Sequence, residues 1–182
     1  MNTTIVKAHD LQFELYLSAE QIQQRVKALG LELTTRFQGK DPVFISILNG
    51  GFIFAADLTR ACTIDCEISF IKLSSYQNTS STGKVVTLIG LDAEVKGKEV
   101  IIVEDIVDTG ETLTQFLKEL NKYKPASITL VSLLVKPEAL QERLEVDYVG
   151  FNIPNKFVIG YGLDYNGVGR NLPGIYQLVK TV

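Results

Sequence analysis

One run of thirteen residues, VIIVEDIVDTGET from Val100 to Thr112, constrains the fold of this chain more than any other feature. Its first four residues are all apolar, which is typical of a strand covered on both faces of a parallel sheet. Glu104 and Asp105 then lie at the carboxyl end of the strand, where ligands bind in open α/β sheets. A helical pattern follows, with apolar residues on one face at Leu113, Phe116, Leu117 and Leu120.

The turn between this strand and this helix predicts an anion site. It reads Asp108-Thr109-Gly110-Glu111-Thr112 and so combines two hydroxyl groups with a glycine. Because a helix N-terminus leaves backbone N–H groups without partners, such a turn presents both N–H and hydroxyl donors to a phosphate. With two carboxylates just before it, the segment can hold a phosphate and a sugar together.

Strands and helices alternate along the rest of the chain. Ser18 and Gln21 form a capping-box pattern that predicts a helix over residues 18–30, with Gly30 as its C-terminal stop. A strand over 43–48, an Asn-Gly-Gly turn and a helix over 52–61 make one βα unit. Further strands are predicted at 66–73, 85–91, 100–103, 127–135, 149–151, 157–161 and 175–179.

This alternation predicts an α/β fold with a mainly parallel sheet flanked by helices and right-handed crossovers. We expect the C-terminal third, which is richer in β-strand, to form a small lobe against that sheet. With 182 residues, 46% of them hydrophobic, the chain is long enough for one well-buried domain, and we predict a single domain over residues 1–182.

Composition and charge exclude several classes of function. The net charge is −3, so bulk electrostatics favours neither nucleic acid nor an anionic membrane as the main partner. We find no basic segment followed by an apolar core at the start, and no apolar stretch as long as a membrane span. The sequence therefore predicts a cytoplasmic protein.

The scarcity of histidine limits the available chemistry. His9 is the only histidine, which argues against a Ser-His-Asp or Cys-His catalytic centre. Cys62 and Cys66 are the only cysteines, and with one histidine they are too few for a tetrahedral zinc site without carboxylates or a second subunit. We therefore interpret them as structural thiols and assign proton transfer to carboxylates, lysine or tyrosine.

The run from Val100 to Thr112 resembles the phosphoribosyl-pyrophosphate (PRPP) motif of type I phosphoribosyltransferases. Four further segments, in chain order, are similar to those of the hypoxanthine-guanine phosphoribosyltransferase family, so the resemblance runs from about residue 43 to residue 170. They are Leu48-Asn49-Gly50-Gly51, the Ser75-Tyr76 pair that opens a polar loop, Leu133-Leu134-Val135-Lys136, and the run from Pro154 to Asn166 followed by Arg170.

The resemblance implies the type I phosphoribosyltransferase fold, with a small hood subdomain built from the chain ends, and a function in purine salvage. Such an enzyme transfers the phosphoribosyl group from PRPP to hypoxanthine or guanine and releases pyrophosphate. It also implies a cis peptide between Leu48 and Asn49. The residues that it assigns to PRPP and phosphate binding are Glu104, Asp105, Thr109, Gly110, Glu111, Thr112, Asn49, Gly50 and Arg170.

The resemblance also assigns the chemistry. Asp108 is the expected general base or acid at purine N7, while Ser75 and Tyr76 belong to a loop that closes over the reaction centre. Lys136 is expected to reach the exocyclic oxygen of a 6-oxopurine, Phe157 to stack on its ring and Val158 to bond its edge through the backbone. Mg²⁺ is the implied cofactor, held by Asp164 together with Glu104 and Asp105.

Three positions depart from the family pattern. Asn49 stands where many relatives have lysine, so the pyrophosphate loop lacks a cation. Glu111 lies inside the phosphate loop, and we expect its side chain to point outward. The sequence Gly167-Val168-Gly169 replaces bulkier residues before Arg170. These departures affect affinity and purine preference more than the class of reaction.

Two other functions remain open from the sequence. The same fold could serve a regulatory protein that senses PRPP or nucleotides and contacts RNA or DNA, although the acidic balance argues against this. An enzyme that uses xanthine or a pyrimidine is the other alternative. The expected partners are PRPP, a 6-oxopurine and pyrophosphate, with no nucleic acid and no membrane. Apolar residues on the helix over 52–61 favour a homodimer or homotetramer, although core packing explains them as well.

Overall fold

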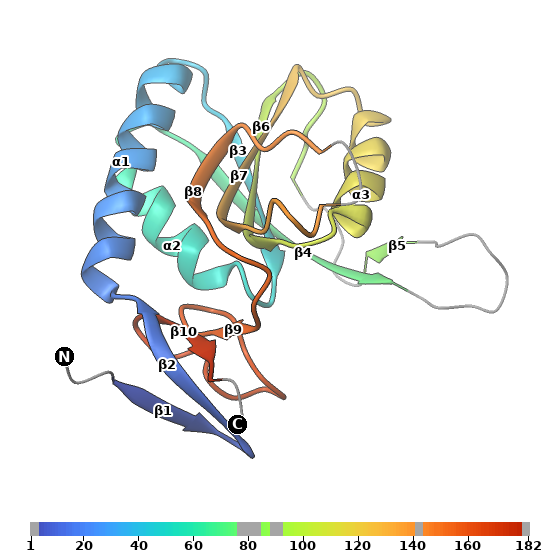
Figure 1. The fold of residues 1–182 in the computed structure, drawn as a ribbon. Coiled ribbons are helices and arrows are strands. Elements are labelled where there is room, and N and C mark those ends of the chain that lie inside the picture. The colour runs from blue at the N-terminus through green and yellow to red at the C-terminus, as the bar shows by residue number, and fades with distance from the viewer. Residues whose placement is uncertain (1–3, 76–84, 88–92, 141–143, 180–182) are drawn as a thin grey trace, which may run out of the picture.

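A computed structural model describes residues 4–75, 85–87, 93–140 and 144–179, which form two sheets (Figure 1). The larger sheet has the strand order β5-β4-β3-β6-β7-β8, and the smaller has the order β1-β2-β10-β9. The elements in chain order are β1 (Ile5–Ala8), β2 (Leu11–Leu17), α1 (Ala19–Phe37), β3 (Val43–Leu48), α2 (Phe52–Ala61), β4 (Glu67–Ser75), β5 (Val85–Thr87), β6 (Glu99–Val107), α3 (Glu111–Asn121), β7 (Ser127–Val135), β8 (Tyr148–Asn152), β9 (Val158–Ile159) and β10 (Ile175–Leu178).

The larger sheet is parallel over five strands, with β5 antiparallel beside β4. Strands β3, β6 and β7 lie in its middle and are almost continuously buried, because helices cover both faces. This explains why their sequences are runs of Val, Ile and Leu rather than alternating patterns. The predicted α/β fold is confirmed.

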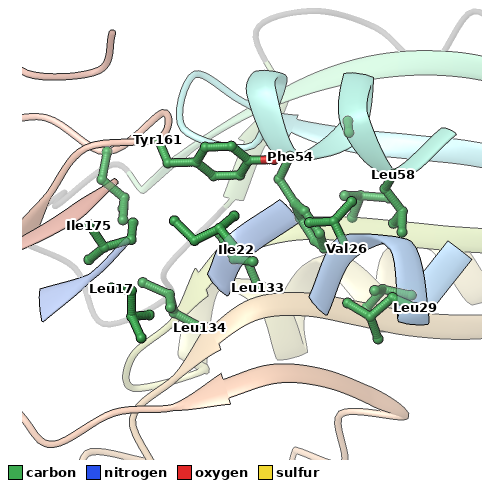
Figure 2. Packing of buried hydrophobic residues seen from close by; sticks show 14 of the residues in the cluster. Leu17, Ile22, Val26, Leu29, Phe54, Leu58, Leu133, Leu134, Tyr161 and Ile175 are labelled. Carbon is green, nitrogen blue, oxygen red and sulfur yellow. The ribbon is translucent and has the colours of Figure 1, made fainter. Parts of the chain in front are cut away.

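Helices α1 and α2 cover one face of the large sheet, and α3 covers the other (Figure 1). One hydrophobic cluster lies on the side of the sheet that α1 and α2 cover. In it, Ile22, Val26 and Leu29 of α1 pack with Phe54 and Leu58 of α2, as Figure 2 shows. A second hydrophobic cluster lies on the other side of the sheet and includes Leu113, Phe116 and Leu120 of α3. None of the helices within the described ranges has the length and apolar character needed to cross a bilayer.

The topological switch point of the large sheet lies between β3 and β6. The chain proceeds from β3 through α2 to β4 on one side, whereas β6 pairs with β3 on its other side. The loops after β3 and β6 therefore leave the same edge of the sheet in opposite directions and open a crevice between them. Ligands of open α/β sheets bind at such a switch point.

The smaller sheet combines the two ends of the chain, as the predicted hood requires. Strand β2 pairs with β1 and with β10, and β10 pairs with β9, all antiparallel. The sequence prediction assigned no element to residues 5–17, although Leu11, Phe13, Leu15 and Leu17 alternate with polar residues and tyrosine. It also wrongly placed residues 149–151 in the C-terminal lobe, since they lie in β8 and extend the large sheet beside β7.

The predicted end of the first helix at Gly30 is wrong. The Ser18–Gln21 capping box is present, but α1 continues for seven residues beyond Gly30, and Leu33 and Phe37 keep the buried face of the helix continuous. Gly30 is buried where α1 meets α2, and a Cβ there would lie 2.6 Å from Ala61 Cβ and 2.7 Å from the Ala61 carbonyl oxygen. The glycine therefore permits close helix packing rather than helix termination.

We predict that Gly30→Ala destabilises the protein even though alanine is the better helix former. The gain in helix propensity is about 1 kcal/mol, whereas overpacking a buried contact costs about 1–3 kcal/mol. Urea unfolding should show a lower midpoint for Gly30→Ala than for the wild type. Gln24→Ala, at an exposed position of the same helix, should stay within about 0.5 kcal/mol of the wild type. A stabilised Gly30→Ala variant would contradict the packing role.

Candidate active site

Two adjoining pockets open at the carboxyl edge of the large sheet. One has a volume of about 280 Å³ and the other about 330 Å³. They share Ile106 and Asp108, which lie at the end of β6 and just after it. The first pocket is also lined by Ile47, Leu73, Glu104, Val107, Thr109, Gly110, Thr112 and Leu113, and the second by Gly50, Asp105, Lys136, Phe157, Val158, Leu163, Asp164 and Arg170.

Glu104 and Asp105 sit side by side at the end of β6 but line different pockets. Neighbouring residues of a strand point to opposite faces, so one strand supplies a carboxyl group to each pocket. Burial raises the pKa of Glu104 well above its ordinary value, and the neighbouring Asp105 charge raises it further. Burial also raises the pKa of Asp105, although hydrogen bonds and the Arg170 charge oppose that rise.

The loop after β6 forms the floor of the first pocket. Gly110 has φ = 80° and begins α3, and this left-handed backbone favours glycine at that position. The Thr114 N–H donates to the Gly110 carbonyl at 2.8 Å, so the first turn of α3 is closed directly behind the loop. Thr109 and Thr112 line the pocket, whereas Glu111 is exposed. The loop and helix start thus form a concave donor surface of the kind that binds phosphate.

Lys136 and Asp108 form an ion pair between the two pockets. The Lys136 Nζ donates to Asp108 Oδ2 at 2.8 Å. The lysine side chain is only 8% exposed, whereas that of Asp108 is 50% exposed. Lys136 follows β7, and its N–H donates to the Val107 carbonyl at 3.0 Å, so the neighbouring strands β6 and β7 fix both residues. A buried ammonium group therefore has a carboxylate partner that a ligand can reach.

Phe157 provides an aromatic wall in the second pocket. It precedes β9, and its ring is 42% exposed. Tyr165 meets it in an edge-to-face contact with a centroid distance of 5.8 Å, and Phe13 of β2 lies 5.9 Å away. The Phe157 carbonyl accepts from the Leu178 N–H at 2.9 Å. The hood thus holds an aromatic face open toward the pocket, beside the buried Val158.

Asp164 and Arg170 form a second ion pair, at 2.6 Å between Arg170 Nη2 and Asp164 Oδ1. The other oxygen of Asp164 accepts from the Gly167 N–H at 2.6 Å. Arg170 also donates through Nη1 to the Gly162 carbonyl at 2.6 Å. The two side chains therefore brace the loop between β9 and β10, with Asp164 and Arg170 both on the pocket wall.

The loop after β3 approaches the carboxyl pair through Gly50. A Cβ at this residue would overlap the Asp105 carboxyl group. On its other side the Gly50 carbonyl touches Gly162, where a Cβ would overlap it. The peptide between Leu48 and Asn49 is cis, as predicted, and Asn49 is exposed. The loop after β3 thus lies between the Asp105 side chain of β6 and the loop after β9.

The structure gathers most of the predicted site residues around these two pockets. Asn49 is next to the second pocket but does not line it, and Ser75 ends β4. Tyr76 and the predicted lid over 75–84 lie outside the described residues, apart from Ser75 itself. In the part of the chain that the structure describes, no three His, Cys, Asp or Glu side chains gather as a metal site, so Glu104, Asp105 and Asp164 do not form one cluster.

Sequence reasoning missed two groups of residues that shape the site. Ile47, Leu73, Ile106 and Leu163 line the pockets as apolar walls, and their patterns resemble those of ordinary core residues. Tyr165 and Phe13 support Phe157 from the hood. For Phe13, the alternation along residues 11–17 could have indicated an inward-facing position.

Comparisons with known proteins agree with this geometry. A phosphoribosyl transferase domain family matches residues 14–166. A hypoxanthine-guanine phosphoribosyltransferase of Bacillus subtilis (strain 168) is 44% identical over 176 residues, which cover 96% of this chain and 97% of that protein. A crystal structure of such an enzyme from Bacillus anthracis superimposes with a TM-score of 0.86 and 44% identity, covering 91% of this chain and 98% of that one.

A longer relative is also similar. The bifunctional protein TilS/HprT of Listeria monocytogenes serotype 4b is 43% identical over 169 residues, which cover 92% of this chain. This chain spans only 26% of the length of that protein. The similarity to it therefore concerns one part of a larger polypeptide.

We predict that Glu104→Gln stabilises the fold at neutral pH. The raised pKa means that ionised Glu104 is disfavoured in the folded state, so wild-type stability falls as pH rises from the ordinary carboxyl pKa of 4.5 through the raised value. Glutamine removes this penalty, so its advantage should be absent below pH 4.5 and should grow as the pH rises toward neutrality. Urea unfolding across pH measures the difference.

Glu138→Gln, at an exposed position, is the control and should change stability little at any pH. A constant offset between Glu104→Gln and the wild type across the whole pH range would show that ionisation of Glu104 does not oppose folding.

Proposed function

This chain belongs to the phosphoribosyl transferase domain family, and we propose that it acts in purine salvage as a hypoxanthine-guanine phosphoribosyltransferase. It transfers the phosphoribosyl group from PRPP to hypoxanthine or guanine, which gives the nucleotide and pyrophosphate. The observation on which this proposal rests is the pairing of a phosphate-type loop, at the start of α3, with a purine-sized aromatic pocket around Phe157 and Lys136.

The first pocket suits the phosphoribosyl end of PRPP. Thr109, Gly110 and Thr112 offer hydroxyl and backbone N–H donors to the 5′-phosphate, while the exposed Glu111 leaves that phosphate free of a facing carboxylate. Glu104 lines the same pocket and Asp105 lies across the strand from it, so together they hold the ribose hydroxyls. The carboxyl pair also stabilises positive charge that develops on the sugar ring as the leaving group departs.

The second pocket suits a 6-oxopurine. Phe157 stacks on the ring, an interaction worth about 1–3 kcal/mol per base, and the Val158 backbone bonds the base edge. The oxo group takes the place of Asp108 as an acceptor for Lys136 Nζ, so base binding exchanges one partner of the lysine for another. A 6-aminopurine has no acceptor at this position, so Lys136 would stay paired with Asp108 and face the amino group of the base, and Asp108 would not be released to take a proton.

The transfer breaks the bond between C1 of the ribose and the pyrophosphate oxygen and forms a bond between C1 and N9 of the purine. The purine must lose the proton that it has on N7. Asp108 is half-exposed between the two pockets and takes this proton, since Lys136 has then moved its hydrogen bond to the base. This general-base role needs no histidine.

Arg170 and Gly50 lie where the pyrophosphate would leave. The guanidinium group of Arg170 presents a planar set of donors, and the peptide N–H groups around Gly50 approach the carboxyl pair closely. Asn49 adds no charge, so Arg170 supplies the side-chain cation of this subsite. On binding, the pyrophosphate takes over part of the interaction that Arg170 makes with Asp164.

The charge balance of the two pockets fits a divalent cation. Among the described lining residues, Glu104, Asp105, Asp108 and Asp164 are acidic and only Lys136 and Arg170 are basic, although the substrate is a polyanion. Mg²⁺ is held in proteins through one or two carboxylates with substrate phosphates and water completing its shell. Because Glu104, Asp105 and Asp164 do not gather into one cluster, Asp164 alone, or Asp105 alone, would supply the protein carboxylate and the substrate oxygens would complete the shell; when bound, the ion would neutralise charge on the pyrophosphate.

We also propose that residues 1–182 act as one domain and that the chain forms homodimers or homotetramers. Ile68 and Phe70 of β4 are 44% and 38% exposed and share the sheet face of Phe44 and Ser46, next to α2. Phe52 at the start of α2 is 43% exposed. A second copy that packs against this side of the sheet would bury these apolar side chains.

The experiment that tests the function is an assay of PRPP with a panel of bases. Hypoxanthine and guanine should be converted to nucleotides, whereas adenine and uracil should not be converted at a comparable rate. Transfer should stop in excess EDTA and return when Mg²⁺ is added in excess of the chelator. Preference for a pyrimidine, or binding of PRPP and nucleotides without any turnover, would replace the proposal by the corresponding alternative. Full turnover in EDTA would refute the magnesium requirement.

We predict that Asp108→Asn lowers kcat by about 10²–10⁴-fold, the usual effect of losing a general acid or base. The amide keeps an oxygen for Lys136 and preserves the loop, so PRPP affinity should change little. Steady-state kinetics gives kcat, and calorimetry with PRPP and Mg²⁺ gives the affinity. An unchanged kcat would assign the proton transfer to another group.

A further inference from the structure

A part-buried hydrogen bond joins the loop after β9 to helix α2. The Tyr161 hydroxyl donates to Asp57 Oδ2 at 2.6 Å. Tyr161 is 3% exposed and packs in the cluster with Phe54, and its ring lies beside α2 in Figure 2. Gln23 of α1 donates to the same Asp57 oxygen at 2.8 Å, and Arg60 lies 3.7 Å from the other oxygen. One carboxylate thus connects α1, α2 and the loop after β9.

The backbone at Tyr161 leaves little freedom to the residues around it. Tyr161 has φ = 48°, in the left-handed region that is uncommon for a side-chain-bearing residue, and Gly160 and Gly162 on either side both have φ = 104°. The Tyr161 N–H donates to the Leu172 carbonyl at 2.8 Å. The aspartate therefore holds the side chain of a residue in a tight turn, where both neighbouring residues are glycines.

This turn touches the pyrophosphate subsite directly. Gly162 packs against the Gly50 carbonyl, and its own carbonyl accepts from Arg170 Nη1 at 2.6 Å. The Gly162 N–H in turn donates to the Arg170 carbonyl at 2.9 Å. A displacement of Tyr161 would therefore move both the guanidinium group and the contact with the loop after β3.

Asp57 and Gly50 belong to the same βα unit. Gly50 lies just before α2, and Asp57 lies within α2. The hydrogen bond thus ties Tyr161 to the helix that follows the pyrophosphate loop, so the loop after β9 and the loop after β3 share one rigid support.

We propose that Asp57 and Tyr161 are positioning residues that set Arg170 and the turn at Gly162 against the loop at Gly50, and so determine affinity for the pyrophosphate group of PRPP. This inference rests on the proposed function and concerns the part of its site that holds the leaving group. Burial and the Asp57 charge raise the pKa of Tyr161, so its hydroxyl remains a donor at all physiological pH values.

The hydrogen bond could either stabilise the fold alone or position Arg170, and these two roles predict different effects of its loss. If it only stabilised the fold, its loss would lower the melting temperature and leave the two substrates equally affected. If it positions Arg170, its loss acts on PRPP and pyrophosphate and spares the purine, because Phe157, Val158 and Lys136 are supported by the hood strands and β7. The comparison of the two substrates therefore separates the roles.

The test uses Tyr161→Phe, which keeps the packed ring and removes only the hydroxyl. Calorimetry with PRPP and Mg²⁺ should show affinity weakened by about 5–20-fold, which falls within the range of coupling energies between residues that share a network. The KM for hypoxanthine at saturating PRPP should stay within about twofold of the wild type. Asp57→Ala should match Tyr161→Phe, and Asp57→Asn, which keeps an acceptor oxygen, should recover most of the affinity.

Tyr148→Phe is the matched control, because Tyr148 packs against the same cluster from β8. It should leave the affinity for PRPP unchanged. In a double variant with Arg170→Ala, Tyr161→Phe should add little further loss if it acts through Arg170. Equal losses for both substrates, additive losses with Arg170→Ala, or wild-type affinity in Tyr161→Phe would each overturn the positioning role.

Measurements on the wild-type protein separate a failure of this inference from a failure of the proposed function. Wild-type protein that transfers phosphoribosyl groups while Tyr161→Phe behaves identically overturns the positioning role alone. Wild-type protein that neither binds PRPP nor turns it over overturns both.

Discussion

The burial of two adjacent carboxyl groups at the end of β6 is the constraint on which the rest of the site depends. Desolvation raises the pKa of both Glu104 and Asp105, although Glu104 is partly exposed where it lines the first pocket. Buried charge of this kind costs stability unless partners compensate for it. The two carboxyl groups lie on β6, a central strand that pairs with β3 on one side and with β7 on the other, so its backbone is held rigidly. In the proposed function, the hydroxyl groups of the ribose and the positive charge that develops on its ring would compensate for this cost.

Close backbone approach is the second requirement, and it explains the glycines that surround the carboxyl pair. Gly50 must lack a side chain because the Asp105 carboxyl group occupies that space, and Gly162 must lack one because the Gly50 carbonyl does. The loop after β3 therefore packs against the Asp105 carboxyl group of β6 on one side and against the backbone of the loop after β9 on the other. This leaves the functional side chains at the rim, where Asp108, Asp164 and Arg170 reach the pockets.

The sequence predicted the parts of this arrangement that are local. The bounds of β3, α2 and β7 agree with the prediction, because continuous apolar runs and an Asn-Gly-Gly turn mark them directly. Gly30 was misread because a glycine that permits helix contact and a glycine that ends a helix look alike in one chain. The partnership of Tyr161 with Asp57 was not predicted either, since the two are 104 positions apart and the motif that contains Tyr161 does not include Asp57. Long-range pairs of this kind require the fold itself.

The two ion pairs of the site show how one arrangement serves both the free and the bound protein. Lys136 is almost fully buried, and without Asp108 its charge would lack a partner while the pocket is empty. Arg170 is held in the same way by Asp164. Each cation of the two pockets thus has a carboxylate partner within the protein. In the proposed mechanism, ligand binding exchanges this oxygen partner for one on the ligand, so Asp108 would be free to accept a proton only when a base has engaged Lys136.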